Sequence, residues 1–354
     1  MTTPPPPGAD AIRTVLQRLA ARAALGAPEI REAFRLIMRG EAEPTELAAL
    51  LMGLRVRGES PEVLVGIVDA MREVMVPVPV RADLLAVDTC GTGGGSVRTL
   101  NISTAAAFVV AGAGVPVAKH GNRSFTSRSG SADVLEALGI GTDTGPELAA
   151  QLLEEVGIVF LFAPNFHPAM RHLAATRRAL AVPTVMNLVG PLANPAGVQR
   201  QVIGVADAAV APLVAGALLG LGCVTGLVVH GEIGLDEISP VGLTRVWQVS
   251  GGGIVETLID PGMFGLATQD LSGTEGGSPT ENARAIERLM HEPRAASPAL
   301  RSAVLLNAAA AILVSGTTTD FAEAVRRATT ALDDGAAAER LQALRAAAPL
   351  RTSG

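Results

Sequence analysis

The sequence predicts an α/β protein in which a small all-helical domain precedes a larger domain built around a largely parallel sheet. Two observations support this class. Apolar residues recur at helical spacing through the first eighty residues, and no strand-like alternation occurs before Leu84. Beyond that point, short apolar runs that end in glycine-rich loops alternate with alanine-rich helical segments, as is typical of parallel sheets.

The helical part should contain several short helices. Residues 31–39 and 46–54 carry apolar side chains at helical spacing, and a glycine follows each segment. Ser60 can cap a further helix, because the proline after it suits the first helical turn and the next acid complements the helix dipole. These elements predict a compact helical unit.

The larger domain should contain five buried strands, each followed by a loop. In sheets of this kind ligands bind beyond the carboxyl ends of the strands, and the distinctive motifs of this sequence fall there. The expected strands are 84–87, 115–118, 158–162, 202–205 and 227–229.

These patterns suggest domain bounds. We assign residues 1–80 to the helical domain, on which part of 175–200 should pack, and residues 81–345 to the α/β domain. The last residues, 346–354, should form a frayed tail.

Composition excludes several classes of protein. A net charge of −6 over 354 residues disfavours a nucleic-acid binder, although a loop of backbone N–H groups can still bind a small anion. The two cysteines, Cys90 and Cys223, have no partner at metal-ligand spacing, which makes a zinc site or disulfide framework improbable. The longest apolar stretch, 213–229, contains several glycines and does not resemble a membrane span. We expect a cytoplasmic protein without a membrane segment.

The first motif that carries chemistry is a glycine-rich loop. Residues 88–96 (DTCGTGGGS) lead through 99–104 (TLNIST) into an expected helix at 105–111. Glycines let a backbone approach a bulky anion, and Ser103 and Thr104 lie near a helix N-terminus, where N–H groups point outward. A pyrophosphate site is one interpretation, and a plain glycine-rich turn with hydroxyl capping is the other. The loop matches neither the P-loop nor the dinucleotide-binding pattern.

A second motif is rich in cations and hydrogen-bond donors. It runs from Lys119 through Arg123 to Asp133 (KHGNRSFTSRSGSAD) and follows an expected strand. Lys119, Arg123 and Arg128 could balance phosphate charge while hydroxyl and N–H groups donate hydrogen bonds. A solvated loop would not need this density of donors. His120 is ambiguous, since a single histidine is more often structural than catalytic.

Two further motifs are weaker in isolation. Asp236 and Glu237 follow the last expected strand, and adjacent carboxylates at such a place can hold Mg²⁺, although acidic pairs in loops usually serve solvation. Arg177 lies between His167-Pro-Ala-Met and the segment 187–195 (NLVGPLANP). The planar guanidinium of Arg177 could bind a carboxylate through two hydrogen bonds. The alternative, which is commoner for a single arginine on a helix, is a solvent-exposed side chain without a ligand.

Together the four motifs resemble the anthranilate phosphoribosyltransferase family, in order and from about Ile30 to Ala309. The resemblance implies a fold like that of the nucleoside phosphorylases, an active site between the two domains, and a homodimer that contacts through the helical domain. It also implies transfer of the phosphoribosyl group of phosphoribosyl pyrophosphate to the amine of anthranilate, a step of tryptophan biosynthesis, with Mg²⁺ as the metal. The products would be N-(5-phosphoribosyl)anthranilate and pyrophosphate.

The resemblance also implies roles for particular residues. Anthranilate would be bound by Gly91, Asn122 and Arg177, with His120 lining its approach, and Mg²⁺ by Ser103, Asp236 and Glu237. No residue is assigned as a catalytic acid or base, because the aromatic amine is largely unprotonated at neutral pH. The donor would contact Gly91, Gly94, Gly95, Thr99, Asn101, Ile102, Ser103, Thr104, Lys119, His120, Gly121, Asn122, Arg123, Ser124, Phe125, Thr126, Ser127 and Ser131.

Four positions depart from the family pattern. Gly95 and Ile233 each stand where the family has an aspartate, and both changes remove negative charge from the metal side. Pro183 and Met186 replace an arginine and a phenylalanine after Arg177 and could alter the acceptor pocket. Two alternatives therefore stay open: a related transferase or phosphorylase with another acceptor, and a non-enzymatic relative that binds nucleic acid. The acidic net charge disfavours the second.

Overall fold

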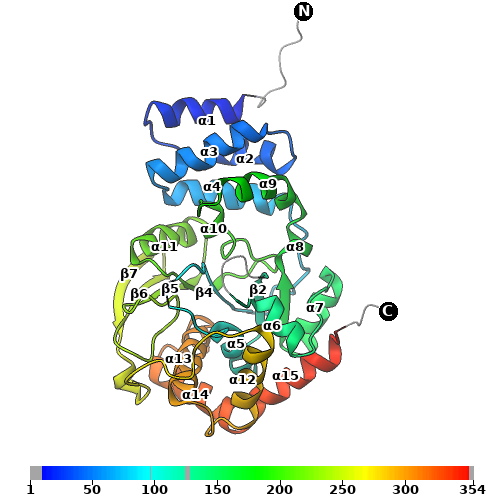
Figure 1. The fold of residues 1–354 in the computed structure, drawn as a ribbon, viewed down its shortest axis with the longest axis vertical. Coiled ribbons are helices and arrows are strands. Elements are labelled where there is room, and N and C mark those ends of the chain that lie inside the picture. The colour runs from blue at the N-terminus through cyan, green and yellow to red at the C-terminus, as the bar shows by residue number, and fades with distance from the viewer. Residues whose placement is uncertain (1–9, 96, 124–127, 351–354) are drawn as a thin grey trace, which may run out of the picture.

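The computed structural model describes residues 10–95, 97–123 and 128–350. Figure 1 shows a helical part stacked on a larger α/β part. Glycines with positive φ or prolines mark several helix ends, such as Gly58 (φ 91°) after α3 and Pro61 at the start of α4. The helical part consists of α1 (Ala11–Ala20), α2 (Ala27–Met38), α3 (Pro44–Arg57) and α4 (Pro61–Arg72).

Two later helices return to this helical part. After leaving the α/β part, α9 (Arg171–Leu180) packs on α2 and α3, and the short α10 (Met186–Val189) packs on α4. The expected helices at 31–39 and 46–54 correspond to α2 and α3, with shifted ends. Ser60 occupies the N-cap position of α4, but its side chain makes no capping hydrogen bond to the backbone.

The α/β part contains a five-stranded sheet with the order β1-β4-β5-β6-β7. β1 (Asp88–Gly91), β4 (Arg200–Gly204) and β5 (Thr225–Gly231) are parallel, whereas β6 (Thr244–Ser250) and β7 (Gly253–Ile259) are antiparallel. Two further parallel strands, β2 (Val117–Gly121) and β3 (Ile158–Phe162), form a separate pair that a single bridge between Val87 and Val117 joins to the region of β1. The predicted fold class is confirmed.

Several details of the sheet differ from the prediction. The segment expected as a strand at 84–87 is not one, because β1 begins only at Asp88, where the chain first pairs with β4. The antiparallel pair β6 and β7 was missed. β7 is an edge strand whose residues are almost all exposed, so its sequence carries no alternation of buried and exposed positions.

Helices cover both faces of the sheets. α5 (Ile102–Gly112) begins directly after the glycine-rich loop and packs against α13 and α15. α11 (Ala211–Gly220) packs on α4 and so links the sheet to the helical part. The other helices are α6 (Ser131–Ala137), α7 (Pro146–Glu155), α8 (Ala163–Phe166), α12 (Pro279–His291), α13 (Pro298–Val314), α14 (Phe321–Asp333) and α15 (Ala336–Ala347).

The buried apolar residues form two cores. One lies between the sheets and the helices α5 and α12 to α15. The other runs continuously from the helical part, through α11, to Ile203, Val228 and Trp247 on the opposite face of the five-stranded sheet. The two parts of the chain therefore share a core. Within the described residues, no helix is long and apolar enough to cross a membrane.

The expected tail at 346–354 includes residues that belong to the fold, whereas 351–354 lie outside the described residues. α15 continues to Ala347, and Pro349 forms an isolated bridge with Ile140. The backbone nitrogen of Gly141 donates to the carbonyl of Ala348 at 2.7 Å, and that of Leu350 to the carbonyl of Gly139 at 3.1 Å. Residues up to 350 are therefore part of the fold, because this segment satisfies backbone groups next to α6.

Candidate active site

The acidic pair lies at the start of α5. The carboxylate of Glu237 accepts a hydrogen bond of 3.1 Å from the backbone nitrogen of Ser103, in the first turn of that helix. The carboxylate of Asp236 lies against Gly91, where a Cβ atom would stand 2.9 Å from its Oδ2. The structure thus brings Ser103, Asp236 and Glu237 together at the ends of β1 and β5, and Gly91 leaves room for the carboxylate.

The two carboxylates crowd each other in a poorly solvated place. Burial raises the pKa of Asp236, although a hydrogen bond from the backbone of Gly93 opposes this. Burial and the neighbouring Asp236 raise the pKa of Glu237, while Lys119 and Ser103 act in the opposite direction. Such a pair would gain from a cation between its oxygens.

The donor set suits Mg²⁺. In the described part of the chain, no cluster of three or more His, Cys, Asp or Glu side chains could enclose a metal ion. Mg²⁺ fits a site of this kind, because it typically binds one or two carboxylates and completes its shell with phosphate oxygens and water. Asp236, Glu237 and the hydroxyl of Ser103 are the residues that could hold it.

Lys119 brings a buried cation to the same place. Its side chain is only 4% exposed and comes from β2. The ammonium group donates to the carbonyl of Thr89 and, at 3.2 Å, to Oγ of Ser103. Both of these acceptors are neutral, although the ammonium also lowers the pKa of the buried carboxyls of Asp88 and Glu237. Its positive charge lies at the N-terminus of α5, where an anion could bind.

A buried acid and amide support the strands that carry these groups. Asp88 is completely buried and accepts a 3.1 Å hydrogen bond from the backbone nitrogen of His120. Asn194 donates to Asp88 and to the carbonyl of Ala118, both at 2.8 Å, and accepts from the backbone nitrogen of Ala196 at 2.9 Å. One amide therefore connects β1, β2 and the linker after α10.

His120 and His167 form a buried pair with ring centres 5.2 Å apart. Each Nε2 atom is buried and makes no hydrogen bond with the described residues. Burial lowers the pKa of His120 to about 3, helped by the neighbouring His167, and burial lowers that of His167 to about 4. Both rings are therefore neutral at pH 7 and cannot act there as general acids.

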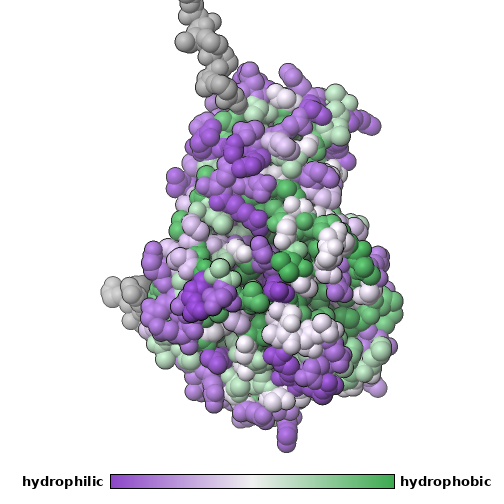
Figure 2. Space-filling view, turned by 180° about the vertical axis from the view of Figure 1, so that it is seen from behind, coloured by the Kyte–Doolittle hydropathy of each residue, from purple (hydrophilic) through white to green (hydrophobic). Residues whose placement is uncertain are grey.

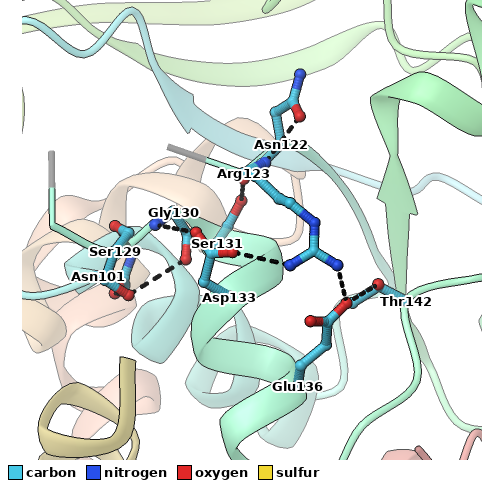
Figure 3. A network of polar contacts seen from close by, with 9 residues as sticks. All are labelled: Asn101, Asn122, Arg123, Ser129, Gly130, Ser131, Asp133, Glu136 and Thr142. Carbon is cyan, nitrogen blue, oxygen red and sulfur yellow. Dashed lines mark hydrogen bonds and ion pairs between the residues drawn. The ribbon is translucent and has the colours of Figure 1, made fainter. Parts of the chain in front are cut away.

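Arg123 is engaged by α6. Its guanidinium binds Asp133 at 3.0 Å and Glu136 at 2.6 Å and lies 5.6 Å from the ring centre of Phe162. Glu136 also accepts from Thr142 at 2.8 Å, and Figure 3 shows this chain of contacts. The charge of Arg123 is thus balanced by two carboxylates of α6.

The backbone on either side of Arg123 is held closely. A Cβ atom at Gly121 would lie 2.2 Å from Oγ of Ser131 and 2.7 Å from the ring of Phe160, so only glycine fits there. Ser131 in turn donates to the carbonyl of Asn122 at 3.2 Å. The strand end and the start of α6 are therefore locked together. The predicted donor contacts Ser124, Phe125, Thr126 and Ser127 lie outside the described residues.

The glycine-rich loop offers mainly backbone to a ligand. Gly94 has a φ of 85°, which favours glycine, and a Cβ atom there would meet nothing within 4 Å. Ile102 and Thr104 point into the core and are 1% exposed, so only their backbone can reach a ligand. Thr99 and Asn101 lie at the other end of the loop, where Thr99 forms an isolated bridge with Glu275.

Arg177 comes from a different part of the fold. It lies on α9, beside the helical part, and is half-buried. Burial lowers its pKa, and its guanidinium makes no hydrogen bond or ion pair with the described residues. A desolvated guanidinium without an anion could receive a carboxylate.

The four departures occupy different environments. Gly95 has a non-positive φ, and a Cβ atom there would lie 3.3 Å from Cβ of Ala206, so a side chain would be tight. Ile233 is 36% exposed. Pro183 is exposed after the end of α9, whereas Met186 is buried and begins α10 in the core shared with the helical part.

The sequence prediction missed supporting residues. A Cβ atom on Gly204 would stand 1.7 Å from the carbonyl oxygen of Asp236, so the acidic pair can sit where it does only above a glycine. In the sequence, Gly204 appeared only as a glycine within the apolar run 202–205, which is a weak signal for such a close contact. Asp88 and Asn194 lay inside recognised motifs, but their contact spans 106 positions and has no local signature.

Comparisons with known proteins place this chain in a family. Residues 83–338 match the glycosyl transferase family a/b domain, and residues 13–75 match the helical bundle domain of the same family. The anthranilate phosphoribosyltransferase of Desulforudis audaxviator is 48% identical over 94% of this chain and 95% of its own length. That of Rubrobacter xylanophilus is also 48% identical, over 94% of this chain and 96% of its own length.

Solved structures agree with this result. The crystal structure of anthranilate phosphoribosyltransferase from Thermus thermophilus has a TM-score of 0.88, with 41% identity and coverage of 96% of this chain and 99% of that one. The Saccharomyces cerevisiae enzyme in complex with phosphoribosyl pyrophosphate and Mg has a TM-score of 0.87, with 27% identity and coverage of 95% and 97%. The chain belongs to the anthranilate phosphoribosyltransferase family.

Proposed function

We propose that this chain transfers the phosphoribosyl group of phosphoribosyl pyrophosphate to the amine of anthranilate, with release of pyrophosphate. The observation that carries this proposal is the convergence of Lys119, Ser103 and the acidic pair Asp236–Glu237 at the N-terminus of α5. A helix start, a buried ammonium and two carboxylates suited to Mg²⁺ together form a site for a metal-bound pyrophosphate.

The donor side works through electrostatics that are in place before the reaction. When the bond from the ribose C1 atom to pyrophosphate breaks, negative charge grows on the leaving group and positive charge on the sugar. Lys119 and the N–H groups at the start of α5 stabilise the leaving group, and the glycine-rich loop admits it because Gly91 and Gly94 carry no side chain. Bound Mg²⁺ would neutralise phosphate charge.

The acceptor side needs orientation more than proton transfer. The amine of anthranilate is largely unprotonated at neutral pH, so it can attack C1 without a strong base. Arg177 binds the carboxylate of anthranilate, and Asn122 and Gly91 direct the amine toward the donor. Arg177 is supported by its environment, because it is half-buried without an anion among the described residues. The choice of acceptor is supported by Saccharomyces cerevisiae anthranilate phosphoribosyltransferase, which has been solved in complex with 4-fluoroanthranilate.

The metal and the assembly form part of the same proposal. We infer that Mg²⁺ is the working ion, held by Ser103, Asp236 and Glu237, because these groups present oxygen ligands beside the expected pyrophosphate. We also infer a cytoplasmic homodimer that contacts through the helical domain, as the resemblance implies, which size-exclusion chromatography with light scattering would test.

Anthranilate consumption tests the reaction directly. Purified protein mixed with phosphoribosyl pyrophosphate, Mg²⁺ and anthranilate should cause the fluorescence of anthranilate to fall. If fluorescence stays constant while calorimetry shows that the donor binds, the acceptor assignment is wrong and a related transferase with another acceptor becomes the better interpretation. Binding of single-stranded DNA that weakens with added salt would instead favour the nucleic-acid alternative.

A further inference from the structure

A buried asparagine on α12 lies next to the donor side of the site. Asn282 is 3% exposed. Its Nδ2 atom donates to Oδ1 of Asn101 at 3.0 Å, and its Oδ1 atom accepts from the backbone nitrogen of Gly277 at 2.8 Å. It belongs to none of the recognised motifs, and 181 positions separate it from Asn101.

Asn101 is in turn connected to the second motif. Its Nδ2 atom donates to the carbonyl of Ser129 at 3.2 Å, and its Oδ1 atom accepts from Oγ of Ser129 at 3.4 Å. Figure 3 shows Asn101 and Ser129 side by side next to Gly130, at the start of α6. The amide of Asn101 is therefore held from two sides, by α12 and by the residues that precede α6.

The chain before α12 also pairs with the loop. The backbone nitrogen of Leu100 donates to the carbonyl of Thr274 at 2.7 Å, and that of Gly276 to the carbonyl of Arg98 at 3.3 Å. A Cβ atom on Gly276 would lie 2.6 Å from the carbonyl oxygen of Thr99. Residues 274–277, which we name the strap, thus lie directly on residues 98–101 and fix the path of the backbone into α5.

We propose that Asn282 is a positioning residue for the donor. Through Asn101 and the strap it fixes the path of the backbone that enters α5, and it fixes the position of the second motif relative to the start of that helix. This inference rests on the proposed function, because it assumes that the donor binds at the start of α5. A buried amide with both groups satisfied specifies one geometry, since any shift of the loop would leave polar atoms unpaired. Preorganised N–H groups bind pyrophosphate more tightly than mobile ones.

Ser315 supplies a matched control. This serine follows α13 and is equally buried, at 3%, and like Asn282 it is held by side-chain contacts: its Oγ atom donates to the carbonyl of Ile312 at 2.6 Å and lies 2.9 Å from Oγ1 of Thr317. It touches neither Asn101 nor the strap. Loss of this side chain should cost similar stability while leaving the entry to α5 intact.

Calorimetric titration with phosphoribosyl pyrophosphate at saturating Mg²⁺ tests the proposal without any acceptor. Asn282→Ala should raise the Kd of the donor by about tenfold, because the loss of roughly one hydrogen bond would let the entry to α5 shift. Ser315→Ala should lower the Tm about as much as Asn282→Ala does and change the donor Kd by less than about threefold. Equal changes in Kd for the two variants would overturn the positioning role.

A second variant guards against misfolding of the first. Gly276→Ala removes no polar group but pushes the strap away from Thr99, so it should weaken donor binding in the same way. The KM of anthranilate should change little in either variant. If Gly276→Ala binds the donor as the unmodified protein does, the strap has no positioning role. If the unmodified protein binds the donor without consuming anthranilate, only the acceptor half of the proposed function fails.

Discussion

Removal of Arg177 is expected to separate binding of the acceptor from every other property of the protein. The guanidinium is half-buried and burial lowers its pKa, yet no anion lies beside it among the described residues. The folded protein therefore bears the cost of desolvating this charge without a compensating partner. A carboxylate that reaches Arg177 recovers that cost.

The expected size follows from this environment. A charge-assisted hydrogen bond in a partly buried site contributes about 1.5–3 kcal/mol, so Arg177→Ala should raise the KM of anthranilate by roughly 10- to 100-fold. The KM of phosphoribosyl pyrophosphate should change by less than about twofold. Because the side chain has no partner to leave unpaired, its removal should lower the free energy of unfolding by no more than about 0.5 kcal/mol.

Steady-state kinetics with each substrate varied in turn would measure this difference. Arg178→Ala is the matched control, since its side chain is the next on α9 and is exposed. Arg177→Lys should restore only part of the affinity, because an ammonium cannot bind a carboxylate in the bidentate way. Equal rises in both KM values, or a large loss of stability, would refute the assignment of Arg177 to the acceptor.

Three further predictions concern stability and the metal. Because His120 and His167 have pKa values of about 3 and about 4 in the folded chain, below the ordinary 6.5, the unfolded chain takes up protons first; the free energy of unfolding should fall below about pH 6.5, by about 2 kcal/mol per histidine near pH 5. Urea unfolding near pH 6.5 and near pH 5 measures this difference, and an unchanged free energy of unfolding would contradict it. Gly204→Ala should displace Asp236, whose carbonyl oxygen would lie 1.7 Å from the new Cβ atom, and should raise the half-saturating Mg²⁺ concentration more than about tenfold in activity titrations. In the same titration Gly95→Asp should lower that concentration by about fivefold, since it adds a carboxylate on the metal side, and no change would show that the side chain cannot reach the ion.

The sequence was sufficient for the fold class and for the motifs, because both depend on local patterns. Glycine-rich loops after apolar runs predicted where ligands should bind, which stays a prediction, and Glu237 of the acidic pair does lie beside Ser103 in space. Strand ends were less predictable. β1 starts four positions later than its apolar run, because a strand begins where a neighbour offers hydrogen bonds and not where hydrophobicity begins.

Contacts between distant segments could not be predicted from the sequence. Arg123 was expected to balance phosphate charge, but its nearest anions are Asp133 and Glu136, which only the position of α6 brings close. Asn282 belongs to no motif in the sequence, and only the fold brings it to Asn101. Such residues act through geometry that a single sequence does not display.

The surface shows one more consequence of the sheet. β7 exposes the apolar side chains of Ile254, Val255 and Leu258, and the nearby Met263 is exposed too. Figure 2 shows hydrophobic colour gathered along the flank of the α/β part, whereas the helical part above it is mostly hydrophilic. An unprotected edge of this kind is a place where chains can associate at high concentration.

The core that the helical part shares with the sheet limits how this chain can be recombined. Ile203, Val228 and Trp247 on the sheet are covered through α11 by the helices that begin the chain. A chimaera that joins these helices to the α/β part of a relative would have to carry α11 and the matching sheet face with them. The unit of exchange in this protein is therefore a core assembled from separate stretches of sequence, so a single crossover between α4 and β1 would leave two mismatched halves.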